Sequence, residues 1–114
     1  MSETFRFEKY TVDVTIEDKA YTLDASIDAQ DYIKETAKDL MQMASDFKEG
    51  KIDGKGVCEQ LFAIVDHLLG SGSAAEMFAK SKQPVQDAMD VCQFLFRIAG
   101  EYGRNLAKKM TVVN

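Results

Sequence analysis

Apolar and polar residues alternate along the first part of the chain, over residues 5–25. The apolar face of this pattern carries Val12, Val14, Ile16, Tyr21 and Leu23. Period-two alternation of β-branched and aromatic residues predicts strands, so we expect an antiparallel β-hairpin over residues 5–25. Phe5 and Phe7 either extend its first strand or begin another. Because an isolated hairpin is only marginally stable in water, its apolar face is expected to lie against the rest of the domain.

After the hairpin, apolar residues recur every three or four positions, which predicts amphipathic helices. Asp28 is expected to cap the first helix and Gly50 to end it. The predicted apolar stripe of this helix consists of Ile33, Ala37, Leu40, Met41, Ala44 and Phe47. After a loop over residues 51–56, the stripe of a second helix consists of Val57, Leu61, Ile64, Val65 and Leu68. Gly70 is expected at the C-terminal cap of this second helix.

Two further helices are predicted in the last third of the chain. Ser73 and Glu76 have the spacing of a capping box, so we expect a short helix that begins at Ser73 and ends by Ser81. Pro84 suits the first turn of a last helix, because its fixed φ is helical and its missing N–H is not needed there. The stripe of this helix consists of Val85, Ala88, Met89, Cys92, Leu95, Phe96, Ala99, Tyr102 and Leu106.

These elements together predict an α+β fold that is mostly α. An N-terminal β-hairpin (residues 5–25) precedes a helical part (residues 28–109) of about four helices, one of them short, and a frayed tail (residues 110–114). Without an internal repeat or linker, the sequence indicates a single domain over residues 1–114. No apolar run approaches the ~20 residues of a membrane span, and the N-terminus lacks the layout of a signal peptide. We therefore expect a cytoplasmic protein that does not bind membranes.

Composition and charge narrow the class of protein further. The chain is 46% hydrophobic and 29% charged, which is typical of a folded domain rather than a disordered segment. Fourteen Lys and Arg residues stand against nineteen Asp and Glu residues, so the net charge is −5. An acidic chain repels phosphate backbones, which argues against nucleic-acid binding. Cys58 and Cys92 fall in apolar helical patterns and are expected to be buried thiols in a reducing compartment.

Catalytic and metal-binding patterns are missing from the sequence. The one histidine, His67, lies nine positions after Cys58 on the same predicted helix, about 13 Å away along its axis. We expect a partly exposed helical histidine there. One His and two scattered Cys lack the spacing of a zinc site. We therefore expect no enzymatic activity, no cofactor and no metal.

The methionines suggest a different kind of site. Methionine fills irregular gaps in a core, which is its commoner role, and it also lines surfaces that accept varied partners. Met43 and Phe78 lie toward the edges of the apolar stripes. The candidate partner-binding residues are Met43, Phe47, Met77 and Phe78, on helix faces that extend beyond what a small core needs. The open strand edges of the hairpin also predict a homo-oligomer.

The order of elements resembles that of the tail assembly chaperones of long-tailed phages and prophages. In that family a helix commonly runs into a Leu-Gly-x-Gly turn, a short Ala-Glu-x-Phe-like helix and a long terminal helix. Here residues 68–78 read Leu-Leu-Gly-Ser-Gly-Ser-Ala-Ala-Glu-Met-Phe, a hairpin over residues 11–24 comes before them, and a long helix over residues 84–109 follows.

This resemblance implies a non-catalytic protein of the bacterial host cytoplasm. Such chaperones bind the tape measure protein, keep its hydrophobic helices soluble, help to recruit the tail tube protein, and self-associate. The family has no fixed binding motif, so no individual site residue follows from the resemblance. Two alternatives stay open: a structural component of the virion, such as a tail completion or connector protein, and a small regulatory protein that binds a host protein.

Overall fold

The computed structural model describes residues 2–111, and side-chain burial for residues 2–109. Two strands come first in the chain, β1 (Thr11–Ile16) and β2 (Lys19–Asp24). Four helices follow them in the order α1 (Ile27–Lys48), α2 (Gly54–Leu69), α3 (Ser73–Met77) and α4 (Pro84–Thr111). This order confirms the predicted α+β, mostly helical fold with one short helix.

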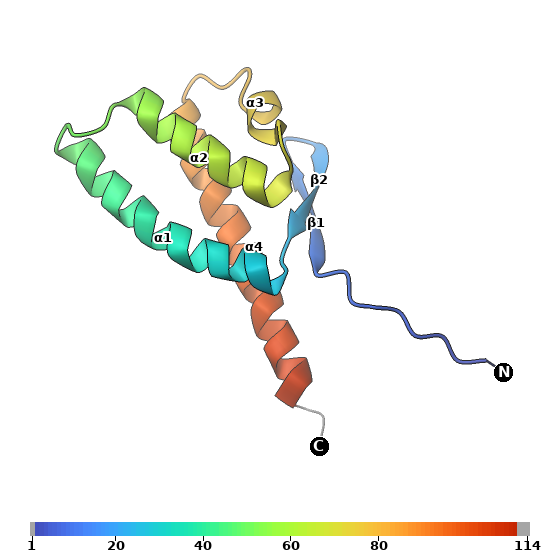
Figure 1. Cartoon of the computed structure of the whole chain (residues 1–114). Coiled ribbons are helices and arrows are strands. Elements are labelled where there is room, and N and C mark those ends of the chain that lie inside the picture. Colours follow the sequence, from blue (N-terminus) through green and yellow to red (C-terminus); the bar gives the residue numbers. More distant parts are fainter. Residues whose placement is uncertain (1, 112–114) are drawn as a thin grey trace.

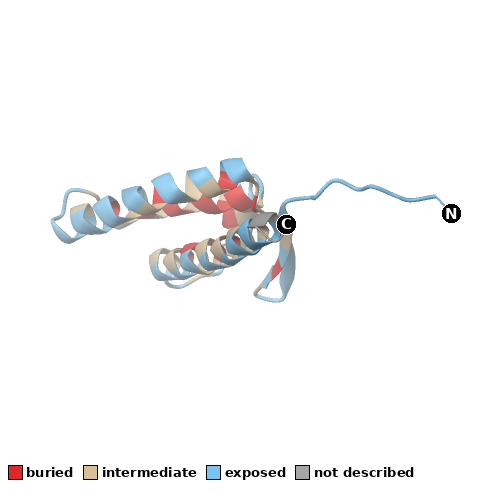
Figure 2. Cartoon of the chain, turned by 90° about the horizontal axis from the view of Figure 1, so that it is seen from below, coloured by how far each residue is buried: buried red, intermediate tan, exposed pale blue. Residues whose placement is uncertain are grey.

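The helices form two layers with the hairpin at one end. Helices α1 and α2 lie side by side as an antiparallel pair, and α4 crosses behind them, packed mainly on α2 (Figure 1). The hairpin and α3 cover the end of α2 that carries its C-terminus, while residues 2–10 extend away from the body (Figure 1). Buried residues lie on the facing sides of the helices, and the outward sides are exposed (Figure 2).

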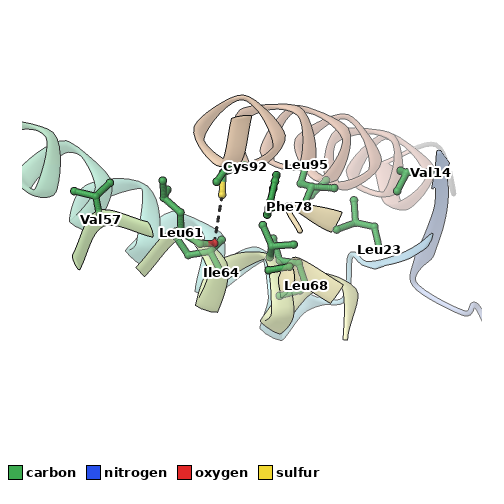
Figure 3. Close-up of a cluster of buried hydrophobic side chains, with 14 of the residues drawn as sticks. Val14, Leu23, Val57, Leu61, Ile64, Leu68, Phe78, Cys92 and Leu95 are labelled. Atoms are coloured by element: carbon green, nitrogen blue, oxygen red, sulfur yellow. Dashed lines mark hydrogen bonds between the residues drawn. The ribbon is translucent and has the colours of Figure 1, made fainter. Parts of the chain in front are cut away.

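The core runs between α2 and α4 toward the hairpin. Its largest fully buried side chains are Leu23, Leu61, Leu68, Leu95, Val65 and Cys92. Figure 3 shows that Val14 and Leu23 of the hairpin continue this row of apolar side chains. The predicted apolar face of the hairpin therefore does pack against the helices.

A two-residue turn closes the hairpin and sets its register. Glu17 and Asp18 both have positive φ, at 49° and 65°, as a type I′ turn requires. Val14 consequently pairs with Tyr21 in the antiparallel register. The prediction that the hairpin begins at residue 5 was too early, because no strand forms before Thr11. Tyr10 also has a positive φ of 55°, which turns the chain away from the line of β1.

The starts of α1 and α2 differ from the sequence prediction, whereas α3 begins at Ser73 as expected but without the predicted cap. Ser26, not Asp28, caps α1, and its side chain accepts a hydrogen bond from the Ala29 backbone N–H at 3.2 Å. Asp53 caps α2 through the Gly56 N–H at 2.8 Å, so this helix begins at Gly54, within the predicted loop. The α3 N-cap is Gly72 and makes no side-chain cap bond, so the expected capping box is absent.

The buried face of α1 is also rotated from the predicted stripe. Its buried residues are Ala29, Thr36 and Met43, whereas Met41 is 76% exposed. A helix at the edge of a small domain contacts its neighbours along one narrow line, and apolar residues beside that line remain in solvent. The last helix, in contrast, follows its predicted stripe and extends past the expected end at Lys109 to Thr111. Residues 112–114 of the predicted tail lie outside the described residues.

Candidate functional site

A cleft of about 680 Å³ opens between the hairpin turn, α3 with the segment after it, and the first turns of α4. Its apolar lining consists of Ile16, Met77, Phe78, Ala79 and Val91. Its polar lining consists of Glu17, Glu76, Lys80, Ser81, Lys82, Asp87 and Asp90. The hairpin turn and residues 76–91, which are distant in the sequence, therefore build one concave surface with an apolar floor and a charged rim.

Met77 and Phe78 form the α3 wall of this cleft. Phe78 is only 8% exposed, and its ring stacks on Phe62 with a centroid distance of 5.0 Å and an interplanar angle of 20°. Its backbone N–H donates to the Ala74 carbonyl at 2.9 Å and ends the short helix. The neighbouring Met77 is half-buried, so its flexible thioether side chain is the more accessible of the two.

The position of α3 depends on a glycine turn and two side-chain contacts. Gly70 and Gly72 have φ of 116° and 86°, values that L-residues with side chains rarely adopt. Asp66 of α2 accepts a hydrogen bond from the Ala74 N–H at 2.8 Å, and so takes the role predicted for Ser73. Lys19 of the hairpin forms an ion pair with Glu76 on the other side of α3.

The first turns of α4 and the residues just before them form the wall of the cleft opposite α3, and three hydrogen bonds fix this wall. The Ser81 hydroxyl donates to the Asp87 carboxylate at 2.5 Å, and the Gln83 N–H donates to the Ser81 oxygen at 3.2 Å. One turn further, the Gln86 amide donates to Asp90 at 2.9 Å. These contacts hold both carboxylates in the first turns of α4, where the helix dipole favours negative charge.

The rim of the cleft is acidic. Four carboxylates line it, against the ammonium groups of Lys80 and Lys82, so the formal charge of the lining is −2. An apolar floor with such a rim suits an apolar segment that carries positive charge beside its anchoring side chains.

The four predicted partner-binding residues fall at two separate places. Met77 and Phe78 lie together in the cleft. Met43 is 4% exposed and borders a smaller hollow of about 170 Å³ with Ile52 and Gln60. Phe47 is 47% exposed near the end of α1. Met43 and Phe78 are therefore core residues, and of the four only Met77 combines partial exposure with a place in the cleft.

Sequence reasoning missed the residues that other elements bring to the site. Ile16 and Val91 line the cleft from the hairpin and from α4, 75 positions apart. Only tertiary packing brings them together, so no local sequence pattern predicts that they share a site. Phe5 and Phe7, at 81% and 87% exposure, lie before β1 and neither extend it nor begin another strand, contrary to the expectation.

The potential nucleophiles show no catalytic arrangement. Cys92 is fully buried, its Sγ lies 3.9 Å from the Leu61 carbonyl oxygen, and burial raises the pKa of its thiol to about 12 (Figure 3). The thiol is therefore protonated at neutral pH and is not a nucleophile. Cys58 is partly exposed, contrary to the prediction of a buried thiol. His67 is exposed, as expected, and stacks on Tyr32 with ring centroids 3.7 Å apart.

Within residues 2–111, no three His, Cys, Asp or Glu side chains are grouped so that they would hold a metal ion. No helix in this part of the chain has the length and apolar character to cross a membrane. Comparisons with protein-family models, with curated proteins and with solved structures found no match.

Proposed function

We propose that this protein is a tail assembly chaperone of a phage or prophage, which acts by binding the tape measure protein in the host cytoplasm. The observation that carries the proposal is the cleft at Met77. The stretch with the family resemblance, residues 68–78, forms the end of α2, the glycine turn and α3. Three of its residues, Glu76, Met77 and Phe78, line the cleft. The segment that carries the family resemblance therefore forms part of the cleft.

The chemistry of the cleft suits a hydrophobic helical client. A tape measure helix would place one or two apolar side chains against Met77 and Val91, with basic residues near the acidic rim. An unbranched methionine adapts to different side-chain shapes, so one cleft accepts successive segments of a long client. Covering these segments keeps the tape measure protein soluble until the tail tube protein assembles around it.

Co-expression with the tape measure protein tests this function. The client to test is the product of a very long, helix-rich open reading frame, which the proposal expects just downstream of the gene. Met77→Asp places a charge in the apolar floor and is expected to reduce the soluble client several-fold. Met41→Asp is the matched control, because Met41 is a well-exposed methionine on α1, outside the cleft lining. Phe78→Asp is unsuitable, since burial of that ring means the variant would unfold.

The outcomes separate the proposal from its alternatives. Equal client solubility with wild type, Met77→Asp and Met41→Asp removes the cleft from the binding site, provided circular dichroism shows each variant folded. A chaperone is absent from purified particles. Stoichiometric presence of the protein in the particle would instead identify a structural component such as a tail completion or connector protein.

A further inference from the structure

The N-terminal arm (residues 2–10) exposes two aromatic side chains, whereas most other Phe and Tyr rings of the chain are at least partly buried. Phe5 and Phe7 contact each other edge to face, with ring centroids 5.3 Å apart, and the charged Arg6 lies between them in sequence. Full burial of each ring would be favourable, because transfer of apolar surface from water is the main driving force of association. The arm therefore has the composition of a docking segment.

We propose that Phe5, Arg6 and Phe7 of one copy dock into the cleft beside Met77 of a second copy. The inference rests on the cleft assigned under the proposed function and names a second occupant for it. The two rings would cover Ile16, Met77 and Val91, which are the partly exposed apolar residues of the cleft. In this arrangement the arm of one copy occupies the cleft that a client would use on the other copy.

Charge complementarity at Arg6 favours this occupant, although the whole arm is neutral because Glu3 and Glu8 offset Arg6 and Lys9. The cleft lining has a formal charge of −2, and Arg6 brings a guanidinium directly between the two anchoring rings. Glu17 stands at the hairpin turn on the rim, and Asp87 and Asp90 face the cleft from α4. A guanidinium beside carboxylates forms charge-assisted hydrogen bonds, which orient the arm as it enters.

The distances place the arm in a different copy from its cleft. Phe7 lies four residues before Thr11, so its Cα reaches about 14 Å from there when the chain is fully extended. The cleft begins at Ile16, the far end of β1, about 17 Å from Thr11. Folding back would also use residues in a turn. Phe7 therefore falls short of its own cleft. Phe5, six residues before Thr11, could span about 20 Å from there, but the hydrogen bond of Glu8 to Tyr102 leaves it a reach of only about 10 Å from the C-terminal half of α4.

Two contacts direct the arm away from the body. The positive φ of Tyr10 breaks the line of β1, while its carbonyl still accepts the Ala25 N–H at 2.9 Å. The Tyr102 hydroxyl donates to Glu8 at 2.6 Å, which ties the arm to the C-terminal half of α4. Tyr102 lies eleven residues after Val91, about 17 Å along the helix from the cleft. The arm thus leaves the body at the start of β1, at the end of the strand away from the hairpin turn (Figure 1).

Arm exchange has a consequence for client binding. Because arm and client use the same floor, a client that enters the cleft displaces the arm of the second copy. The oligomer is then the storage form, and client binding releases protomers by mass action. Self-association and client binding compete.

Sedimentation velocity on the full chain tests the docking. The double variant Phe5→Ser/Phe7→Ser removes both rings from residues that are exposed in the protomer, so its fold is expected to be unchanged. We expect its dissociation constant for self-association to rise by about 100-fold. Met41→Ser, which removes an equally exposed apolar side chain from α1, is expected to leave it unchanged. A wild-type protein that stays monomeric at several hundred micromolar, or an unchanged constant in the double variant, overturns the inference.

Cross-linking identifies the surface that receives the arm. Phe7 is replaced by p-benzoylphenylalanine, and equal amounts of ¹⁵N-labelled and unlabelled protein are mixed before irradiation. The inference predicts cross-links between labelled and unlabelled chains, to Ile16, Glu17 or residues 76–91. Cross-links within one chain, or to another surface, overturn it.

The arm variant also separates this inference from the proposed function. A monomeric Phe5→Ser/Phe7→Ser variant that still solubilises the tape measure protein supports both ideas. If self-association does not depend on the arm while Met77→Asp still impairs client solubility, the arm inference is wrong and the chaperone proposal is unaffected. If the arm occupies the cleft but the tape measure protein does not bind, the chaperone proposal fails alone.

Discussion

The carboxylate of Asp66, in the last turn of α2, accepts a hydrogen bond from the backbone N–H of Ala74 in α3 at 2.8 Å. The bond spans the turn that contains Gly70 and Gly72, and it satisfies an N–H group that the first turn of a helix leaves free. Because α3 forms one wall of the cleft, this contact sets the position of Met77 and Phe78 relative to α2.

The first prediction follows from this contact. Asp66→Ala removes the acceptor and is expected to lower the free energy of unfolding by about 1 kcal/mol, the usual cost of losing a capping side chain. Ser73→Ala, at the position where the sequence predicts the cap, is expected to change it by less than about 0.5 kcal/mol. Urea denaturation of both variants measures the difference. A larger loss with Ser73→Ala would mean that the capping box forms after all.

Two methionines on α1 provide the second prediction. Met43 is buried in the core, so Met43→Ala is expected to cost about 2–5 kcal/mol of unfolding free energy. Met41 is exposed two positions earlier, so Met41→Ala is expected to stay within about 0.5 kcal/mol of the wild type. Thermal and chemical denaturation compare the two variants. Similar losses would contradict the orientation of α1 in this structure.

These two methionines also illustrate how far the sequence determined the fold. Strong periodicity over long segments predicted the type and order of every element, including the stripe of α4. The spacing on α1 fits more than one face, and only the neighbouring helices decide that Met43 is buried. The prediction of the α1 cap was wrong for a similar reason. Ser26 and Asp28 are both good capping residues, and the tertiary path of the chain selects Ser26.

The site was less predictable than the fold. Met77 and Phe78 were predicted because methionine suits adaptable surfaces and Phe78 lies at the edge of an apolar stripe, although the burial of Phe78 was not foreseen. Ile16 and Val91 reach the cleft only through packing of the hairpin on α4, a long-range contact that no local pattern encodes.

The two cysteines should differ in reactivity. Cys92 is fully buried, and that burial raises the pKa of its thiol to about 12, so the thiolate is scarce at pH 8. Cys58 is partly accessible. We expect iodoacetamide to modify Cys58 alone in the native protein, and both residues in 6 M guanidinium. Peptide mapping by mass spectrometry identifies the modified residue, and rapid native modification of Cys92 would contradict its burial.

The contact between Tyr102 and Glu8 predicts a pH window for the arm. Partial burial, then the hydrogen bond to Glu8, raises the pKa of Tyr102 from 10 to about 12. The same hydrogen bond lowers the pKa of Glu8 from 4.5. Because the pKa of Tyr102 is raised, the protonated phenol contributes its full stabilisation to the contact below pH 10. That stabilisation is lost as the pH approaches 12. Because the pKa of Glu8 is lowered, the ionised carboxylate contributes its full stabilisation above about pH 4.5. That stabilisation is lost when further acidification protonates Glu8.

Ultraviolet titration at 295 nm measures the alkaline limit of this window. Tyr102→Phe is expected to remove a phenol transition with a midpoint of about 12. Glu8→Ala is expected to move that transition to lower pH, because the acceptor and its negative charge are gone. A titration curve that Glu8→Ala leaves unchanged would mean that the arm does not contact α4 in solution.

The most direct test of the central claim is a chemical-shift map of the ¹⁵N-labelled protein as an apolar helical segment of the tape measure protein is added. Because the cleft is the proposed binding surface, the largest changes are expected at Ile16 and over residues 76–91, and Met77→Asp should reduce them. Changes centred on Met43 and Phe47, or no changes at millimolar segment, would contradict the account.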